Sequence, residues 1–235
     1  MAARCFACAP WPPIFAVSAA GLVLSLAAMG WPLRHPGATL HHAHEQAGTA
    51  FLLRDWALML LAMMPPLVAA PLMHIAVSSL PHRRSRAIAV FASGYATVWL
   101  AAGPVLIMVA ALLRSLAGGA AFAAAMLIAI VWAISPWQQL ALNRCCRLRR
   151  IGLFGLDADR DCVTFGLLHG LWCIAACWAW MLLPLTAGAA HVPVMTAAGV
   201  IMFRQRLGQP RVPRWRLAML FSPGARRAGQ NLVQR

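Results

Sequence analysis

Apolar residues fall into six long runs separated by short polar segments that are rich in arginine. Five runs reach about 20 residues with few charges, the length that a helix needs to cross a bilayer. The last run is shorter and reaches that length only if it begins near Ala187. The pattern predicts an all-α, polytopic membrane protein with six transmembrane helices. The runs cover residues 11–33, 55–80, 87–113, 119–142, 162–186 and 192–203.

The arginines between the runs predict the orientation. They gather in the second-to-third loop, in the fourth-to-fifth loop and after the last run, whereas the other connections hold two, one or none. Because positively charged loops stay in the cytoplasm, we expect both termini to be cytoplasmic. The chain then divides into a cytoplasmic N-terminus (1–10), a six-helix transmembrane domain (11–207) and a basic cytoplasmic tail (208–235). The first run is longer than a signal-peptide core, so we expect it to be retained.

Composition supports the membrane class and narrows the partners. Hydrophobic residues make up 62% of the 235 residues and charged residues 11%, against about 25% charged residues in soluble domains. The net charge is +15, and every one of the 20 basic residues is arginine. These arginines lie beside apolar runs, which indicates contact with lipid headgroups and not with nucleic acid. Five acidic residues leave little for a hydrolytic or phosphoryl-transfer site.

Four side chains that bind soft metals share one face of the fifth run. They are His169, Cys173, Cys177 and Met181, each four residues after the last. Residues at i and i+4 lie above one another on a helix, and imidazole, thiolate and thioether favour Cu(I), then Zn(II). An ionisable residue within a membrane indicates function by default. The alternative is that these are small buried residues at a helix-packing site.

The second run carries a second group of soft ligands beside two adjacent prolines. Met59 and Met63 share a face, Met64 precedes Pro65 and Pro66, and His74 follows. If the second and fifth helices pack together, the three methionines would face Cys177 and Met181, while His74 would approach His169. Such a column would cross the bilayer. Methionine as a gap filler and proline as a simple kink are the alternatives.

Further thiols and imidazoles lie outside the helices. The pair Cys5 and Cys8 could bind metal or exchange thiols, and the arginines around Cys145 and Cys146 would lower the thiol pKa values. Incidental cytoplasmic thiols remain the alternative for both pairs. The connection after the first run contains a possible metal-capture tract, which could equally be a solvated loop without a role. That tract holds His41, His42 and His44.

Several of these motifs together resemble a bacterial family of integral membrane proteins described as metal-binding and often labelled copper chaperone. The resemblance covers about residues 55–203. It rests on three blocks of residues. The first contains Trp56, Ala62-Met63-Met64 and Pro66, followed by the basic loop, Gly94-Tyr95 and Trp99. The second is Cys145 to Arg147, and the third contains His169-Gly170, Cys173, Cys177-Trp178 and Met181. The chain departs from the family where Ala176 replaces a cysteine. His191 lies where another family ligand segment is altered, and is a candidate substitute.

The sequence therefore predicts a multi-pass protein of the bacterial inner membrane that binds or conveys a soft metal. The expected cargo is copper as Cu(I), with zinc as the second candidate. Expected partners are the lipid bilayer, the metal ion and a metal-accepting membrane protein. Two alternatives remain: a thiol- or quinone-linked redox enzyme that uses Cys173 and Cys177, and a structural subunit of a membrane complex. The candidate ligands are His169, Cys173, Cys177, Met181, Met63, Met64, Met59, His74 and His191.

Overall fold

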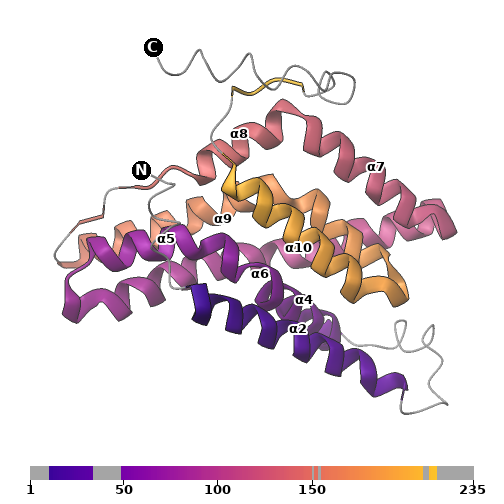
Figure 1. Cartoon of the computed structure of the whole chain (residues 1–235), viewed down its shortest axis with the longest axis horizontal. Coiled ribbons are helices and arrows are strands. Elements are labelled where there is room, and N and C mark those ends of the chain that lie inside the picture. The colour runs from indigo at the N-terminus through magenta and orange to yellow at the C-terminus, as the bar shows by residue number, and fades with distance from the viewer. Residues whose placement is uncertain (1–10, 34–48, 150, 153–154, 209–211, 216–235) are drawn as a thin grey trace.

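The computed structural model describes residues 11–33, 49–149, 151–152, 155–208 and 212–215 (Figure 1). Within these ranges the chain is helical and contains no strand, which confirms the all-α prediction. The terminal segments fall outside the described residues, as does the connection after the first helix. The predictions for Cys5, Cys8, His41, His42 and His44 therefore lie there too.

Helices stand at all six predicted places, and two of the predicted helices are broken in two. The α-helices are α2 (Trp11–Leu33), α4 (Thr49–Met63), α5 (Pro65–Ser78), α6 (Arg84–Ala117), α7 (Ala121–Ile134), α8 (Pro136–Cys145), α9 (Gly155–Thr186) and α10 (His191–Leu207). Single 3-10 turns join some of them: η1 (Pro81–Arg83), η2 (Gly118–Ala120) and η3 (Gly188–Ala190).

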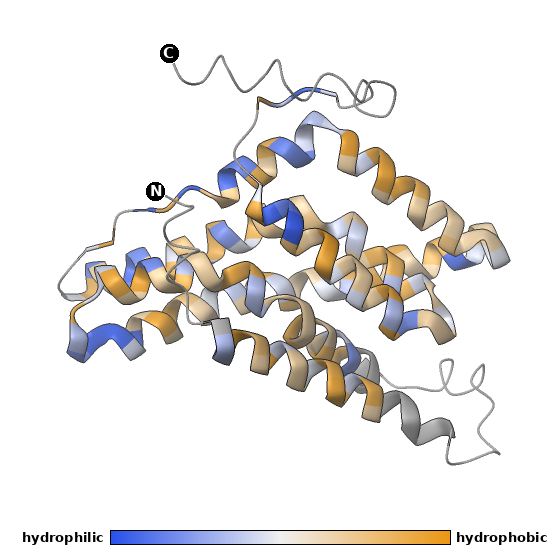
Figure 2. Cartoon of the chain, in the orientation of Figure 1, coloured by the Kyte–Doolittle hydropathy of each residue, from blue (hydrophilic) through white to orange (hydrophobic). Residues whose placement is uncertain are grey.

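Two helical runs among the described residues are long and apolar enough to cross a membrane: Pro81–Ile134, which contains α6 and α7, and Gly155–Thr186, which is α9. The bent pair Leu53–Met63 and Pro65–Ser78 would count as a third. Of the six expected membrane spans, two or three are therefore supported by the length and composition of the helices. The other helices are shorter, and Figure 2 shows hydrophilic positions on α8 and at the end of α10.

The bend between α4 and α5 follows from the two adjacent prolines. Pro65 and Pro66 have no amide hydrogen to donate to the turn before them, and a proline ring also crowds that turn. The two helices meet at 64°. The α2 helix packs against this bend, because a Cβ on Gly21 would lie 2.6 Å from the backbone nitrogen of Ala62.

The fourth run is broken at a position that hydropathy does not reveal. We expected one helix over 119–142, but α7 ends at Ile134 and α8 begins at Pro136. Ser135 takes an extended conformation, and its side chain accepts a hydrogen bond from the Gln138 backbone at 3.2 Å. Serine at the cap, proline at the first position and glutamine three residues after the cap are helix-start signals. The apolar residues on both sides conceal them.

The α9 helix lies at the centre and contacts α6, α7, α8 and α10 (Figure 1). It begins at Gly155, earlier than the expected residue 162, and so includes three aspartates in its first turns. Asp159 accepts hydrogen bonds from Arg83 at 2.9 Å and Arg86 at 2.7 Å. Negative side chains favour a helix N-terminus. The basic second-to-third loop thus lies beside the start of α9.

Glycines allow α6 and α9 to approach closely. A Cβ on Gly94 would lie 2.9 Å from the carbonyl oxygen of Val163, and a Cβ on Gly166 would collide with the carbonyl oxygen of Phe91. A Cβ on Gly170 would lie 3.0 Å from Val98. Small residues spaced by four bring membrane helices into backbone contact. This close crossing sets the distance between Tyr95 on α6 and the cysteines of α9.

Candidate functional site

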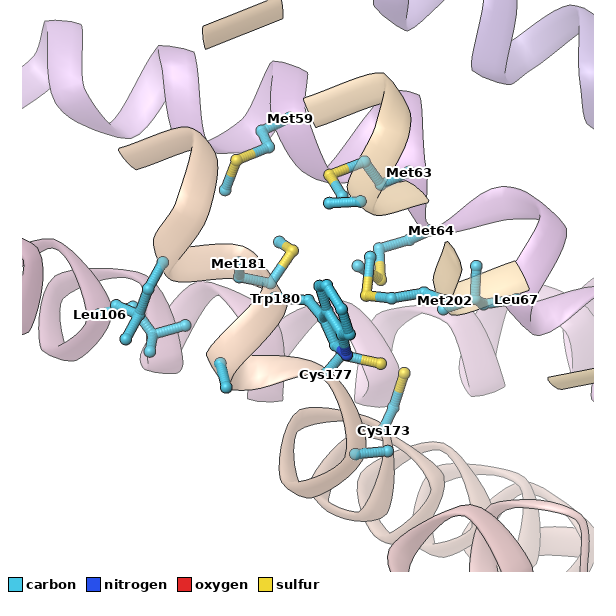
Figure 3. Packing of buried hydrophobic residues seen from close by; sticks show 14 of the residues in the cluster. Met59, Met63, Met64, Leu67, Leu106, Cys173, Cys177, Trp180, Met181 and Met202 are labelled. Carbon is cyan, nitrogen blue, oxygen red and sulfur yellow. The ribbon is translucent and has the colours of Figure 1, made fainter. Parts of the chain in front are cut away.

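The sulfur-bearing face of α9 points into the interior. Cys173, Cys177 and Met181 lie one helical turn apart, and their exposed fractions are 0%, 2% and 0%. A step of four residues returns almost to the same side of an α-helix, so the regular spacing keeps all three on one buried face. In Figure 3 the sulfur atoms of Cys173 and Cys177 point toward each other.

Methionines from two other helices lie beside the α9 sulfurs, and we call the group Cys173, Cys177, Met59, Met63, Met64, Met181, Met195 and Met202 the sulfur cluster. The buried thiol of Cys145 on α8 belongs to the same hydrophobic core. In Figure 3, Met64 and Met202 lie nearest the two cysteines, and Met181, Met63 and Met59 continue the group away from them. The bend at Pro65 turns Met63 and Met64 inward at the end of α4. Met63 also reaches α10, because a Cβ on Gly199 would lie 3.7 Å from its Cγ.

The hydroxyl of Tyr95 joins the thiol and thioether parts of the cluster. It donates a hydrogen bond to Met64 Sδ at 3.3 Å and lies at hydrogen-bond distance, 3.3 Å, from Cys173 Sγ. Tyr95 is held by neighbouring rings on α6, and Trp56 donates from Nε1 to the carbonyl oxygen of Trp99 at 3.1 Å. Residues that share the family motif along the sequence are therefore neighbours in space.

Arg206 is the charged residue of the site. Its side chain lies near the end of α10, is 5% exposed and donates from Nη2 to Cys173 Sγ at 3.0 Å. The Nε atom of Arg206 is buried and has no hydrogen-bond partner among the described residues. A buried charge is costly unless it is paired. The thiols of Cys173 and Cys145 are the groups beside its guanidinium.

The histidines lie around the sulfur cluster and not within it. His169 is buried among Phe91, Tyr95 and Phe165, and its Nε2 has no hydrogen-bond partner among the described residues. The ring of Phe165 packs against both His169 and His74. His74 donates from Nε2 to the backbone carbonyl of Arg149 at 2.7 Å.

His191 lies at the opposite end of α9 from its aspartates. Its Nδ1 donates to the carbonyl oxygen of Pro184 at 2.9 Å. Pro184 follows Cys177 by seven residues, which is about 10 Å along an α-helix. Among the described residues, no three His, Cys, Asp or Glu side chains are grouped closely enough to hold one metal ion. The ligands that do converge are two thiols and several thioethers.

The cysteine pair at the end of α8 differs from the expectation. We expected neighbouring arginines to lower the thiol pKa values, but burial raises the pKa of Cys145 to about 12 and also raises that of Cys146. Arg206 acts in the opposite direction and is outweighed. Desolvation penalises a thiolate more than a nearby guanidinium favours it here, so Cys145 stays protonated at neutral pH.

Sequence reasoning missed Arg206 and Met202 as members of the site. By its position after the last apolar run, Arg206 belongs to the basic segments that predict the orientation. A signal was present, since Met195, Met202 and Arg206 recur on one face of a helix at steps of seven and four residues. The face was hidden because the apolar run ends at Phe203, before the arginine.

A family model described as a copper chaperone, PpoB2, matches residues 53–221 of the chain. The matched segment includes every member of the sulfur cluster together with Tyr95 and Arg206. No curated protein and no solved structure matches the chain.

Proposed function

Because the chain belongs to the copper chaperone family PpoB2, as its motifs predicted, we propose that it binds Cu(I) in the sulfur cluster and passes it to a partner protein. Membership of the family indicates copper handling in general. The ligand set, the oxidation state and the membrane setting are parts of this proposal.

The composition of the cluster supports Cu(I). Thiolate and thioether are soft ligands that select Cu(I), whereas structural Zn(II) sites use four cysteine or histidine ligands. The cluster offers two thiols, Cys173 and Cys177, with Met64 linked to Cys173 through the hydroxyl of Tyr95. We propose that these thiols and Met64 hold the ion. This convergence of two thiols and several thioethers in one buried space is the observation that carries the proposal.

The other thioethers extend the site away from the thiols. Met63, Met59 and Met181 belong to the same buried cluster and would form further stations for a moving ion. On the other side of Cys173, His169 has a buried Nε2 without a partner among the described residues, so it is available as a neighbouring ligand. His74 and His191 are engaged with backbone carbonyls and stay outside this proposal.

The proposed setting is the bacterial inner membrane, with six helices crossing and both termini in the cytoplasm. The outer face of α6 supports a lipid environment, since it exposes a row of large apolar side chains. They are Leu100, Val105, Met108, Leu112 and Leu116. Exposed apolar surface of this extent marks contact with a membrane or another protein. The arginines near the start of α6 and α9 would then meet the inner headgroups.

The test is the copper content of the purified, reduced protein in detergent after anaerobic loading with Cu(I). A double variant, Cys173→Ser with Cys177→Ser, removes both thiols. The matched control is Cys162→Ser, because Cys162 is also buried on α9 but belongs to a different core cluster. We expect about one firmly held copper per chain in the native protein and the control, and little in the double variant. X-ray absorption should show a sulfur-dominated copper environment.

Equal copper in all three proteins, or none in any, would overturn the proposed site. The redox alternative has its own signature: a Cys173–Cys177 disulfide that forms and is reduced reversibly in a protein without bound copper.

A further inference from the structure

A buried arginine is an unusual neighbour for a metal site, because a cation repels a cation. Arg206 is 5% exposed and its Nη2 lies 3.0 Å from Cys173 Sγ. Its positive charge is permanent, since guanidinium is not deprotonated in proteins. Any ion bound to Cys173 must therefore share its ligand with this charge.

No carboxylate among the described residues offsets Arg206. Asp55 pairs with Arg54, and Asp159 pairs with Arg83 and Arg86. Asp161 accepts from the backbone of Gly152, and Asp157 lies in the first turn of α9, at the far end of that helix from Cys177. Among the described residues, the groups near Arg206 that can carry negative charge are the thiols and the hydroxyl of Tyr95.

We propose that Arg206 makes the sulfur site selective for monovalent soft cations. The inference rests on the proposed function and adds that the site selects its metal ion by charge. Two thiolates bound to Cu⁺ carry a net charge of −1, which the guanidinium balances. The same thiolates bound to a divalent ion are neutral, and the guanidinium is left as an unbalanced charge in a buried site. Binding of the metal replaces the protons of the thiols, which leave to solvent.

The energetic basis is the cost of uncompensated charge away from water. An unpaired buried ion is strongly unfavourable. Because thioethers are neutral, Met64, Met63 and Met202 cannot balance the charge of the guanidinium. A third thiolate would do so for a divalent ion. However, no three His, Cys, Asp or Glu side chains of the described chain converge. Cys145, the other thiol near Arg206, lies on α8 and does not complete such a group with Cys173 and Cys177.

The test separates charge from softness with two ions that both prefer thiolates, Ag(I) and Cd(II). We would measure both affinities for the reduced protein in detergent, by competition with chelators, and express them as a ratio. In the native protein Ag(I) should be strongly preferred. In Arg206→Met the Ag(I)/Cd(II) affinity ratio should fall by about a hundredfold to a thousandfold, which corresponds to one unit charge about 4–6 Å from the guanidinium at an effective dielectric constant near 20.

Two further variants complete the design. Arg206→Lys keeps the charge and should keep the preference, and Arg204→Gln removes an exposed arginine of the same helix and should change nothing. An unchanged ratio in a folded Arg206→Met protein would overturn the inference and leave copper binding intact. If Arg206→Met does not fold, the native protein still decides, because Cd(II) binding as tight as Ag(I) binding would overturn it. Copper unaffected by loss of Cys173 and Cys177 would instead refute the proposed function.

Discussion

Replacing Gly166 by alanine tests whether the close crossing of α6 and α9 holds the site together. The added Cβ would collide with the carbonyl oxygen of Phe91 and would also lie 3.1 Å from the backbone nitrogen of Tyr95. These neighbours are backbone atoms of a long helix and cannot rotate away. The two helices must therefore separate, and overpacking of this kind costs about 1–3 kcal/mol.

The expected loss is measurable by thermal unfolding in detergent. At about 2–4 °C per kcal/mol for a chain of this size, the midpoint should fall by about 2–12 °C. Copper retention should fall as well, because Tyr95 follows α6 away from Cys173. The matched control is Gly119→Ala, where the new Cβ has no atom within 4 Å. A midpoint and copper content of Gly166→Ala equal to those of the control would refute the packing argument.

Three smaller changes test the surroundings of the site. Tyr95→Phe removes the hydroxyl between Met64 and Cys173; copper affinity measured by chelator competition should weaken by about threefold to tenfold, the value of one hydrogen bond. Ser135→Ala removes the cap of α8 and should lower the free energy of unfolding by about 1 kcal/mol in a denaturant titration. Cys145, whose pKa is raised to about 12, should react with iodoacetamide at pH 8 far more slowly in the folded protein than in the unfolded chain, and faster as the pH rises.

A specific experimental result would contradict each of these predictions. Native copper affinity in Tyr95→Phe would show that the hydroxyl does not order the ligands. For the cap, Ser115→Ala is the control, since Ser115 bonds only within its own helix, and an equal loss in both variants would point to a general effect. Labelling of Cys145 is measured by peptide mass spectrometry, and rapid labelling at pH 8 would contradict the burial of this thiol.

Much of the helical layout could be predicted because hydropathy is a local property of the chain. A helix stands at every apolar run, and the break before Pro65 follows from the missing amide hydrogens. The break at Ser135 was missed because apolar residues continue across it, although the serine, proline and glutamine signals are present. The early start of α9 is not predicted by hydropathy, because three aspartates occupy its first turns and the apolar run begins only at residue 162.

The candidate ligands could be named in part because helical periodicity places i and i+4 on one face. Cys173, Cys177 and Met181 follow from that rule, and so do Met59 and Met63. The neighbours of that face could not be named, since periodicity is silent about which helix packs against it. Tyr95 enters the site through the packing of α6 on α9, and the face of α10 that carries Met202 joins the site because α10 packs against α9.

The sequence by itself determined that this chain is helical, strongly apolar, and supplied with soft ligands at helical spacing. These are consequences of side-chain chemistry and of the pitch of the helix. Only the tertiary structure decided that Phe165 packs against both His74 and His169, and that Arg206 points inward to Cys173. The physical reason is that an arginine at a helix end can reach either lipid headgroups or a buried partner. Glycines on α6 and α9 and the bend after Met64 decide which neighbours lie within reach.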